Sequence, residues 1–99
     1  MSNGKGYWVV VYRNVKDPSA LAAYSALATP AVTAAGGRVL MRGLADEIRE
    51  QGVKARTVVI EFGSFEEAVA AYESDAYKAA LVALGDAVER DFRIFRGAE

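Results

Sequence analysis

The sequence of 99 residues contains no cysteine and no histidine. Without cysteine, the chain cannot form a disulfide, a thiolate metal site or a thiol nucleophile. Without histidine, it lacks the commonest general base and the usual side-chain ligand of zinc and haem. No group of acidic residues has the spacing of ligands for a hard cation. The sequence therefore predicts neither a metal site nor another cofactor.

The sequence also lacks an excess of either charge. It has 12 basic and 13 acidic residues, which give a formal net charge of -1. Domains that bind nucleic acid are usually basic, with clustered Lys and Arg, so we expect no nucleic-acid partner. No segment has the roughly 20 apolar residues of a membrane span. The apolar stretch 7–12 is too short for a signal peptide, so we expect no membrane association and a cytoplasmic location.

What the sequence does contain is a regular alternation of strand and helix patterns in a single predicted domain, 1–99. Four segments are rich in β-branched and aromatic residues, which favour strands. One helix is expected to start at Asp17-Pro18, to bend or break at Pro30 and to end at Gly36-Gly37. A second starts at the capping box that begins with Ser64 and can restart after a bend at Ser74. The predicted strands are 7–12, 38–42, 56–62 and 91–96.

The order β-α-β-β-α-β predicts an α+β, ferredoxin-like fold with a four-stranded antiparallel sheet and the helices on one face. The first and third strands are the most apolar and should be central, whereas the arginine-bearing strands should form the edges. Side chains alternate across a strand, so two faces can be assigned. The expected helix-facing set is Val9, Val11, Val39, Met41, Val58, Ile60, Phe62, Phe92 and Ile94. The expected opposite set is Trp8, Val10, Tyr12, Arg38, Leu40, Arg42, Thr57, Val59, Glu61 and Arg93.

The second set predicts a homodimer and a site between its subunits. It would leave Trp8 and Tyr12 in an apolar patch of a size that monomers rarely expose, so a second copy should cover it. Arg38 or Arg42 could hold a carboxylate there with a forked pair of hydrogen bonds. Glu61 could act as a base if burial raised its pKa. Alternatively, Glu61 and Arg38 form an ordinary ion pair, which is the commoner role of such residues.

Four aromatic residues are further candidates for ligand contact. Trp8 and Tyr12 could stack on an aromatic ligand or anchor the dimer interface, where Trp and Tyr are enriched. Tyr72 and Tyr77 could donate to a ligand, although a tyrosine at helical spacing more often belongs to the core. Exposed aromatics on central strands also occur in RNA-binding ferredoxin-like domains, but the balanced charge argues against that function.

Several segments resemble the domain-of-unknown-function family numbered 1330, within the dimeric α/β-barrel superfamily. These segments are 36–43, 56–62 and 71–77, together with Gly6-Tyr7-Trp8 and Asp17-Pro18. The resemblance implies a ferredoxin-like fold and a dimer whose two sheets close into a barrel. The superfamily includes cofactor-independent monooxygenases, lactone isomerases, haem-handling enzymes and ligand-sensing domains, so the fold alone does not identify an activity. The sequence departs from the family pattern at Gly63, Ala71 and Leu84, where proline, an aromatic residue and arginine are common.

Three functional hypotheses follow. The first is a small-molecule-binding homodimer whose cleft holds a small apolar or aromatic acid, with Arg38 or Arg42 on the carboxylate. The second is a cofactor-independent enzyme that performs proton transfer or oxygenation with Glu61 and an arginine. The third is a dimer with a purely structural or interaction role. The first is preferred, and a closed ion pair between Glu61 and Arg38 would weigh against the second.

Overall fold

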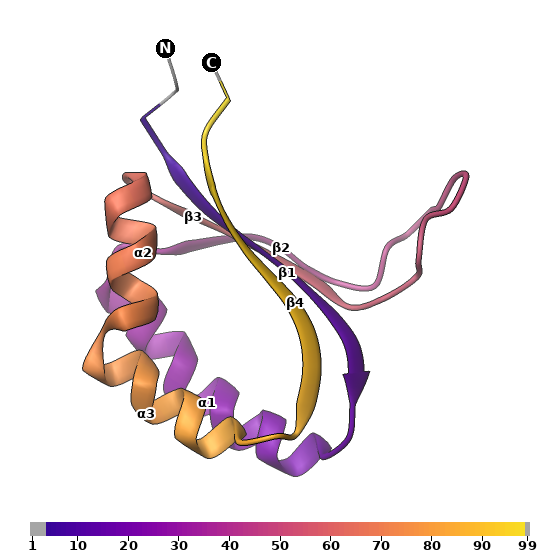
Figure 1. Cartoon of the computed structure of the whole chain (residues 1–99), viewed down its shortest axis with the longest axis horizontal. Helices are drawn as coiled ribbons and strands as arrows, with labels where there is room; N and C mark the ends of the chain where they lie inside the picture. Colours follow the sequence, from indigo (N-terminus) through magenta and orange to yellow (C-terminus); the bar gives the residue numbers. More distant parts are fainter. Residues whose placement is uncertain (1–3, 99) are drawn as a thin grey trace.

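The computed structural model describes residues 4–98. Its elements follow the order β-α-β-β-α-α-β (Figure 1). They are β1 (Gly6–Val15), α1 (Pro18–Ala34), β2 (Arg38–Gly43), β3 (Thr57–Phe62), α2 (Phe65–Glu73), α3 (Asp75–Leu84) and β4 (Val88–Arg96). None of these helices has the length and apolar character that a membrane crossing requires.

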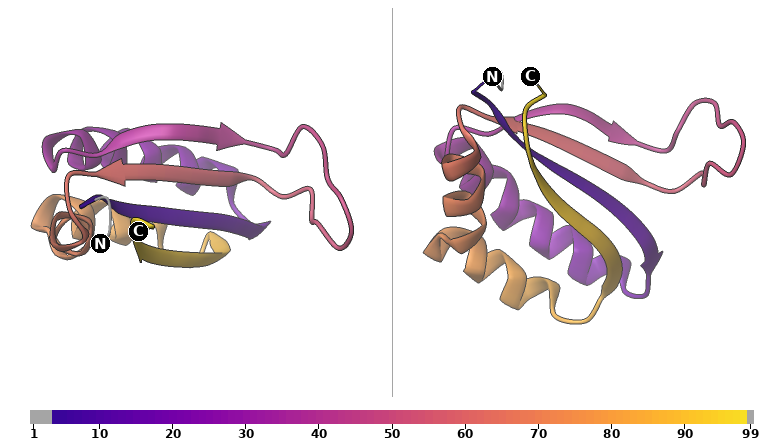
Figure 2. Two further views of the ribbon diagram at one scale, coloured as in Figure 1. Left: turned by 90° about the horizontal axis from the view of Figure 1, so that it is seen from above. Right: turned by 45° about the horizontal axis from the view of Figure 1, so that its top comes forward.

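The strands form one antiparallel sheet in the order β2-β3-β1-β4. This order confirms the prediction that the first and third strands are central. Figure 2 shows all three described helices on the same side of the sheet, so its other face carries no helix. The predicted α+β, ferredoxin-like architecture is confirmed. The segment that joins β2 to β3 extends well beyond the sheet as a long loop (Figure 2).

Side-chain caps define where the helices begin. The carboxylate of Asp17 accepts hydrogen bonds from the amides of Ser19 and Ala20, and Pro18 occupies the first helical position. Helix α1 continues through Pro30, so of the two expected effects, a bend or a break, the break is wrong. Ser74 separates α2 from α3, as the sequence predicts, and its hydroxyl accepts from the amide of Tyr77 at 3.2 Å.

The core lies between the sheet and the helices, and it corrects the predicted orientation of β1. Trp8, Val10 and Tyr12 are buried against the helices, whereas Val9 and Val11 lie on the opposite face. Trp8 is 1% exposed and pairs with Ile60 of β3. Because directly opposed residues in a sheet share a face, this register sends Trp8 into the core. Every residue from 7 to 12 is apolar or aromatic, so alternation alone could not select its inward face.

An irregularity in β2 corrects a second part of the face assignment. Val39 pairs with Ile60, but the register shifts before Met41, which pairs with Val59. One extra residue in a strand reverses the faces of the residues that follow it. Met41 therefore lies on the helix-free face, where it is 58% exposed, and Arg42 points to the helix side. Both residues therefore lie on the faces opposite to those predicted from the sequence.

Candidate functional site

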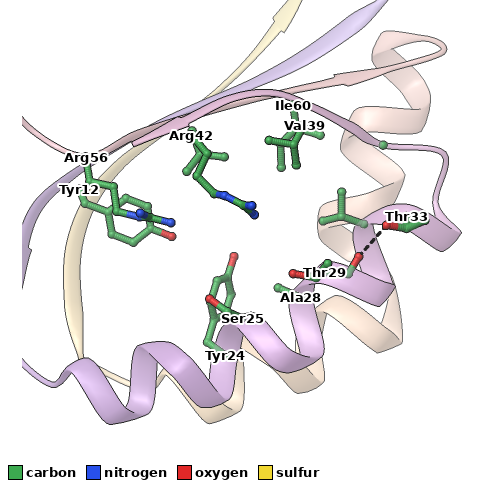
Figure 3. A pocket seen from close by; sticks show the side chains of 13 residues that line it. Tyr12, Tyr24, Ser25, Ala28, Thr29, Thr33, Val39, Arg42, Arg56 and Ile60 are labelled. Atoms are coloured by element: carbon green, nitrogen blue, oxygen red, sulfur yellow. Dashed lines mark hydrogen bonds between the residues drawn. The ribbon is translucent and has the colours of Figure 1, made fainter. Parts of the chain in front are cut away.

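A pocket of about 120 Å³ opens between the sheet and α1. This volume is several times what one water molecule needs. Its apolar wall comes from α1, β2 and β3, and its polar end is formed by two tyrosines and two arginines (Figure 3). The apolar lining includes Ala28, Val32, Val39, Val58 and Ile60. The polar end consists of Tyr12, Tyr24, Arg42 and Arg56.

The two arginines that line this pocket have no acidic partner in the part of the chain that the structure describes. Among residues 4–98, the carboxylates that form ion pairs do so with other basic side chains. The Nε atom of Arg56 is buried and has no hydrogen-bond partner. Arg42 extends from β2 toward α1, so its guanidinium lies above the hydroxyl of Tyr24 (Figure 3). Buried donors are normally satisfied, so the Nε atom of Arg56 is arranged to receive an acceptor, whereas Arg42 is an exposed residue.

A third arginine lies behind the polar end and organises its hydroxyl groups. Arg90 donates from Nη1 to the hydroxyls of Tyr12 at 3.3 Å and Tyr24 at 3.1 Å. Its Nη2 donates to the hydroxyl of Tyr77 at 3.1 Å, and the hydroxyls of Tyr24 and Tyr77 are bonded to each other. Arg90 has no carboxylate partner within the described residues. Its charge is instead stabilised by phenol oxygens and by the faces of aromatic rings. The Cζ atom of Arg90 lies 5.0 Å from the centroid of the Tyr24 ring.

Tyr12 and Tyr77 of this cluster are held in their protonated form. Burial raises the pKa of Tyr77 well above its ordinary value, and the neighbouring Tyr24 raises it further. Burial also raises the pKa of Tyr12. In both cases Arg90 opposes the shift but does not overcome it. These hydroxyls are therefore hydrogen-bond donors at neutral pH and are poorly suited to act as phenolate bases.

Glu61 and Arg38 lie away from the pocket, on the helix-free face of the sheet. They occupy opposed positions on β3 and β2, and Nη2 of Arg38 is 3.3 Å from Oε1 of Glu61. Oε2 of Glu61 also accepts a hydrogen bond of 3.2 Å from the hydroxyl of Tyr7. Glu61 is thus engaged in an ion pair, the arrangement that weighs against its use as a base.

The predicted site residues are consequently divided between three places. Arg42 and Tyr12 line the pocket, but within one subunit and not on the helix-free face. Trp8 and Tyr77 are each 1% exposed in the core, and Tyr72 is half-buried beside them. Trp8 therefore cannot contact a partner subunit or a ligand on the helix-free face.

Sequence reasoning missed Arg56, Arg90 and Tyr24 as site residues. For the two arginines, the sequence contained a pattern that could have identified them. Arg56 is two residues before the inward Val58, and Arg90 is two residues before the inward Phe92. Because alternate residues of a strand point to the same face, both arginines could have been predicted to point toward the helices. Tyr24 is buried on α1, but nothing in the sequence indicated its contact with Arg90.

Comparisons with known proteins agree with this architecture. A family model described as a domain of unknown function, DUF1330, matches residues 5–98. No curated protein matches the chain. Among solved structures, the methylated form of RPA0582, a protein of unknown function from Rhodopseudomonas palustris, superposes with a TM-score of 0.75. The two chains are 19% identical, and the match covers 97% of this chain and 82% of that one.

Two further structures share the fold. SnoaB, a cofactor-independent oxygenase from Streptomyces nogalater, has a TM-score of 0.64 and 13% identity, over 97% of this chain and 95% of SnoaB. A dimeric protein of unknown function with a ferredoxin-like fold from Bacteroides fragilis has a TM-score of 0.55 and 12% identity, over 97% and 99% of the two chains. At these identities the likeness concerns the fold. Since the family model matches nearly the whole chain, this protein belongs to the DUF1330 family.

Proposed function

We propose that this protein binds a small apolar or aromatic acid in the pocket between its sheet and α1, and that it works as a homodimer. The observation that carries the proposal is the pair of arginines, Arg42 and Arg56, which line an apolar pocket and have no carboxylate partner among residues 4–98. A carboxylate would satisfy both, because guanidinium groups bind it with short, charge-assisted hydrogen bonds. The apolar wall would receive the rest of the ligand.

The helix-free face of the sheet supports the dimer part of the proposal. Val59 lies on this face as expected, whereas Trp8, Val10 and Tyr12 do not. The face carries other apolar residues beside the ion pair of Arg38 and Glu61, and no described helix covers it (Figure 2). Met41 and Phe95 on this face are 58% and 46% exposed. Such a patch is typical of an interface between subunits. The apolar members of this open face are Tyr7, Val9, Val11, Met41, Val59 and Phe95.

Binding is preferred to catalysis because the residues of the enzyme hypothesis are engaged elsewhere. Glu61 does not line the pocket and is paired with Arg38. The pKa values of Tyr12 and Tyr77 are raised, which opposes the formation of a phenolate base. The similarity to SnoaB concerns the fold and supplies no catalytic group.

Titration with phenylacetate tests the binding proposal. We expect saturable binding, followed by calorimetry or by amide chemical shifts, and no binding of the neutral phenylacetamide. Arg56→Met should weaken phenylacetate binding by about ten-fold or more, as expected for loss of a hydrogen bond between charged groups. Arg49→Met is the matched control, because Arg49 pairs with Glu47 in the β2–β3 loop and does not line the pocket. Equal affinity for the acid and the amide would contradict the proposal.

A further inference from the structure

The hydrogen bonds behind the pocket determine which groups its polar end can offer to a ligand. Arg90 has only donors, so each hydroxyl that it contacts must accept from it. The hydroxyls of Tyr12, Tyr24 and Tyr77 all do so. What remains available on each oxygen is its own proton and at most one further acceptor position.

The bond between Tyr24 and Tyr77 has one favourable direction. Tyr77 is 1% exposed, and within the described residues its hydroxyl contacts only Tyr24 and Arg90. If Tyr24 donated to Tyr77, the proton of Tyr77 would be buried without an acceptor, which is costly. If Tyr77 donates instead, its proton has an acceptor in Tyr24, and Tyr24 can direct its own proton into the pocket that it lines.

This direction leaves Tyr24 as a donor toward the pocket. Its oxygen accepts from Arg90 and from Tyr77, so both of its lone pairs are occupied. Tyr12 accepts from Arg90, and its proton is also available to the pocket. With the guanidiniums of Arg42 and Arg56, the polar end presents two positive charges and two phenolic donors (Figure 3).

A simple carboxylate does not use this arrangement fully. Its two oxygens can be held by the two arginines in forked geometry, which leaves the proton of Tyr24 without an acceptor. An oxygen on the carbon next to the carboxylate would supply that acceptor. A keto oxygen suits Tyr24 best because it accepts and has no proton of its own to place among donors.

We propose that the ligand class of this pocket is a 2-oxo acid with an apolar or aromatic side chain. Arg42 and Arg56 would hold its carboxylate, and the hydroxyl of Tyr24 would donate to its keto oxygen. Arg90 acts as a positioning residue, because it occupies acceptor sites and so directs the Tyr24 proton into the pocket. The inference rests on the acid-binding function proposed above and adds the identity of the second recognised group.

Two probes of similar size separate this inference from the function on which it rests. Benzoylformate carries a keto group beside its carboxylate, and phenylacetate does not. The wild-type protein should bind benzoylformate about three- to ten-fold more tightly, the range expected for one added neutral hydrogen bond. Tyr24→Phe should reduce benzoylformate affinity more than phenylacetate affinity, so that the preference for benzoylformate disappears.

Thr33→Val is the matched control. Thr33 also lines the pocket, but its hydroxyl donates to the carbonyl oxygen of Thr29 at 2.9 Å and is not available to a ligand. The variant should keep the wild-type preference for benzoylformate. Thermal unfolding of each variant checks that the fold is retained, and the wild-type comparison of probes needs no variant.

Each outcome is decisive. A preference that disappears in Tyr24→Phe and persists in Thr33→Val supports the inference. Equal wild-type affinity for the two acids overturns it and leaves acid binding intact. A preference that survives Tyr24→Phe also overturns it, because the keto oxygen would then be recognised elsewhere. Failure of both acids to bind overturns the proposed function itself, and the inference with it.

Discussion

The indole Nε1 of Trp8 donates a hydrogen bond of 2.8 Å to the backbone carbonyl of Ala68, 60 residues further along the chain. This bond joins the central strand β1 to helix α2. The Trp8 ring also lies within 5.0 Å of the ring centroids of Phe62, Tyr77 and Phe92. Trp8 therefore connects the sheet to both halves of the second helical segment.

We expect Trp8→Phe to lower the free energy of unfolding by roughly 2–3 kcal/mol, because it removes a buried donor and leaves a cavity. Urea unfolding measures this change. Val82→Ala is the control, since Val82 is 83% exposed and its loss should cost less than about 0.5 kcal/mol. A similar midpoint for the two variants would show that Trp8 is not a core residue.

The proposed dimer predicts different effects for one charge placed on two surfaces. Val59→Glu puts a carboxylate at the centre of the helix-free face, beside Val9 and Met41, and should yield monomers in sedimentation velocity. Val82→Glu puts the same charge on an exposed position of α3 and should leave the dimer intact. An unchanged dimer affinity in Val59→Glu would place the interface elsewhere.

The ion pair between Arg38 and Glu61 should matter little to stability or to ligand affinity. The Arg38 side chain is 74% exposed, and pairs of this kind contribute about 0–1 kcal/mol. Glu61→Gln should therefore retain benzoylformate and phenylacetate binding, measured as above. A large loss of affinity in this variant would restore Glu61 as a functional residue and favour the enzyme hypothesis.

Gly6 should not tolerate a side chain, because β1 passes close to the start of α2 there. A Cβ atom at Gly6 would overlap the carbonyl oxygen of Ser64 and lie 2.7 Å from Cα of Phe65. Gly6→Ala should destabilise the fold by about 1–3 kcal/mol or more, the usual effect of overpacking. Gly63→Ala is a suitable comparison, since its Cβ would meet the movable carboxylate of Glu67, and it should cost less.

The cap of α1 predicts one source of acid sensitivity. The hydroxyl of Ser19 and the amide of Ala20 donate to Asp17 and lower its pKa below the ordinary 3.8. A lowered pKa in the folded state means that this carboxylate stabilises the fold above pH 3.8 and loses its effect as the pH falls through the lower value. Asp17→Asn should show a smaller drop in melting temperature between neutral pH and about pH 3. An identical drop in both proteins would contradict this assignment.

The sequence was sufficient to predict the elements, their order and the central pair of strands, because these depend on local patterns. It also gave the inward faces of β3 and β4, since polar residues such as Thr57, Glu61 and Arg93 mark their outward positions. The inward face of β1 could not be predicted, because the segment from Tyr7 to Tyr12 contains no polar residue to show which alternate positions point outward. Its orientation is set by pairing with two distant strands, as in the match of Trp8 with Ile60 and Ile94.

The candidate site was predictable only in part, for a related reason. Arg42 was recognised as a ligand-binding candidate. The direction of its side chain depends on the register shift after Val39, and no residue in the sequence indicates that shift. The cluster around Arg90 depends on contacts between β4, α1 and α3, which lie far apart in the sequence. Chemistry that arises from tertiary contacts cannot be seen in a periodic pattern.

The register shift in β2 makes the chemistry of the pocket sensitive to the pairing of an edge strand. If Leu40 entered the ladder opposite Val59 and the bulge closed, Met41 would pair with Val58 and take the inward position that Arg42 now occupies. One wall of the pocket would exchange a guanidinium for a thioether without a single substitution. In evolutionary terms, loss of the codon for Leu40 would remove the bulge and leave Arg42 inward, whereas a relative of the same length with an unbroken ladder should have a more apolar cavity and bind less acidic molecules.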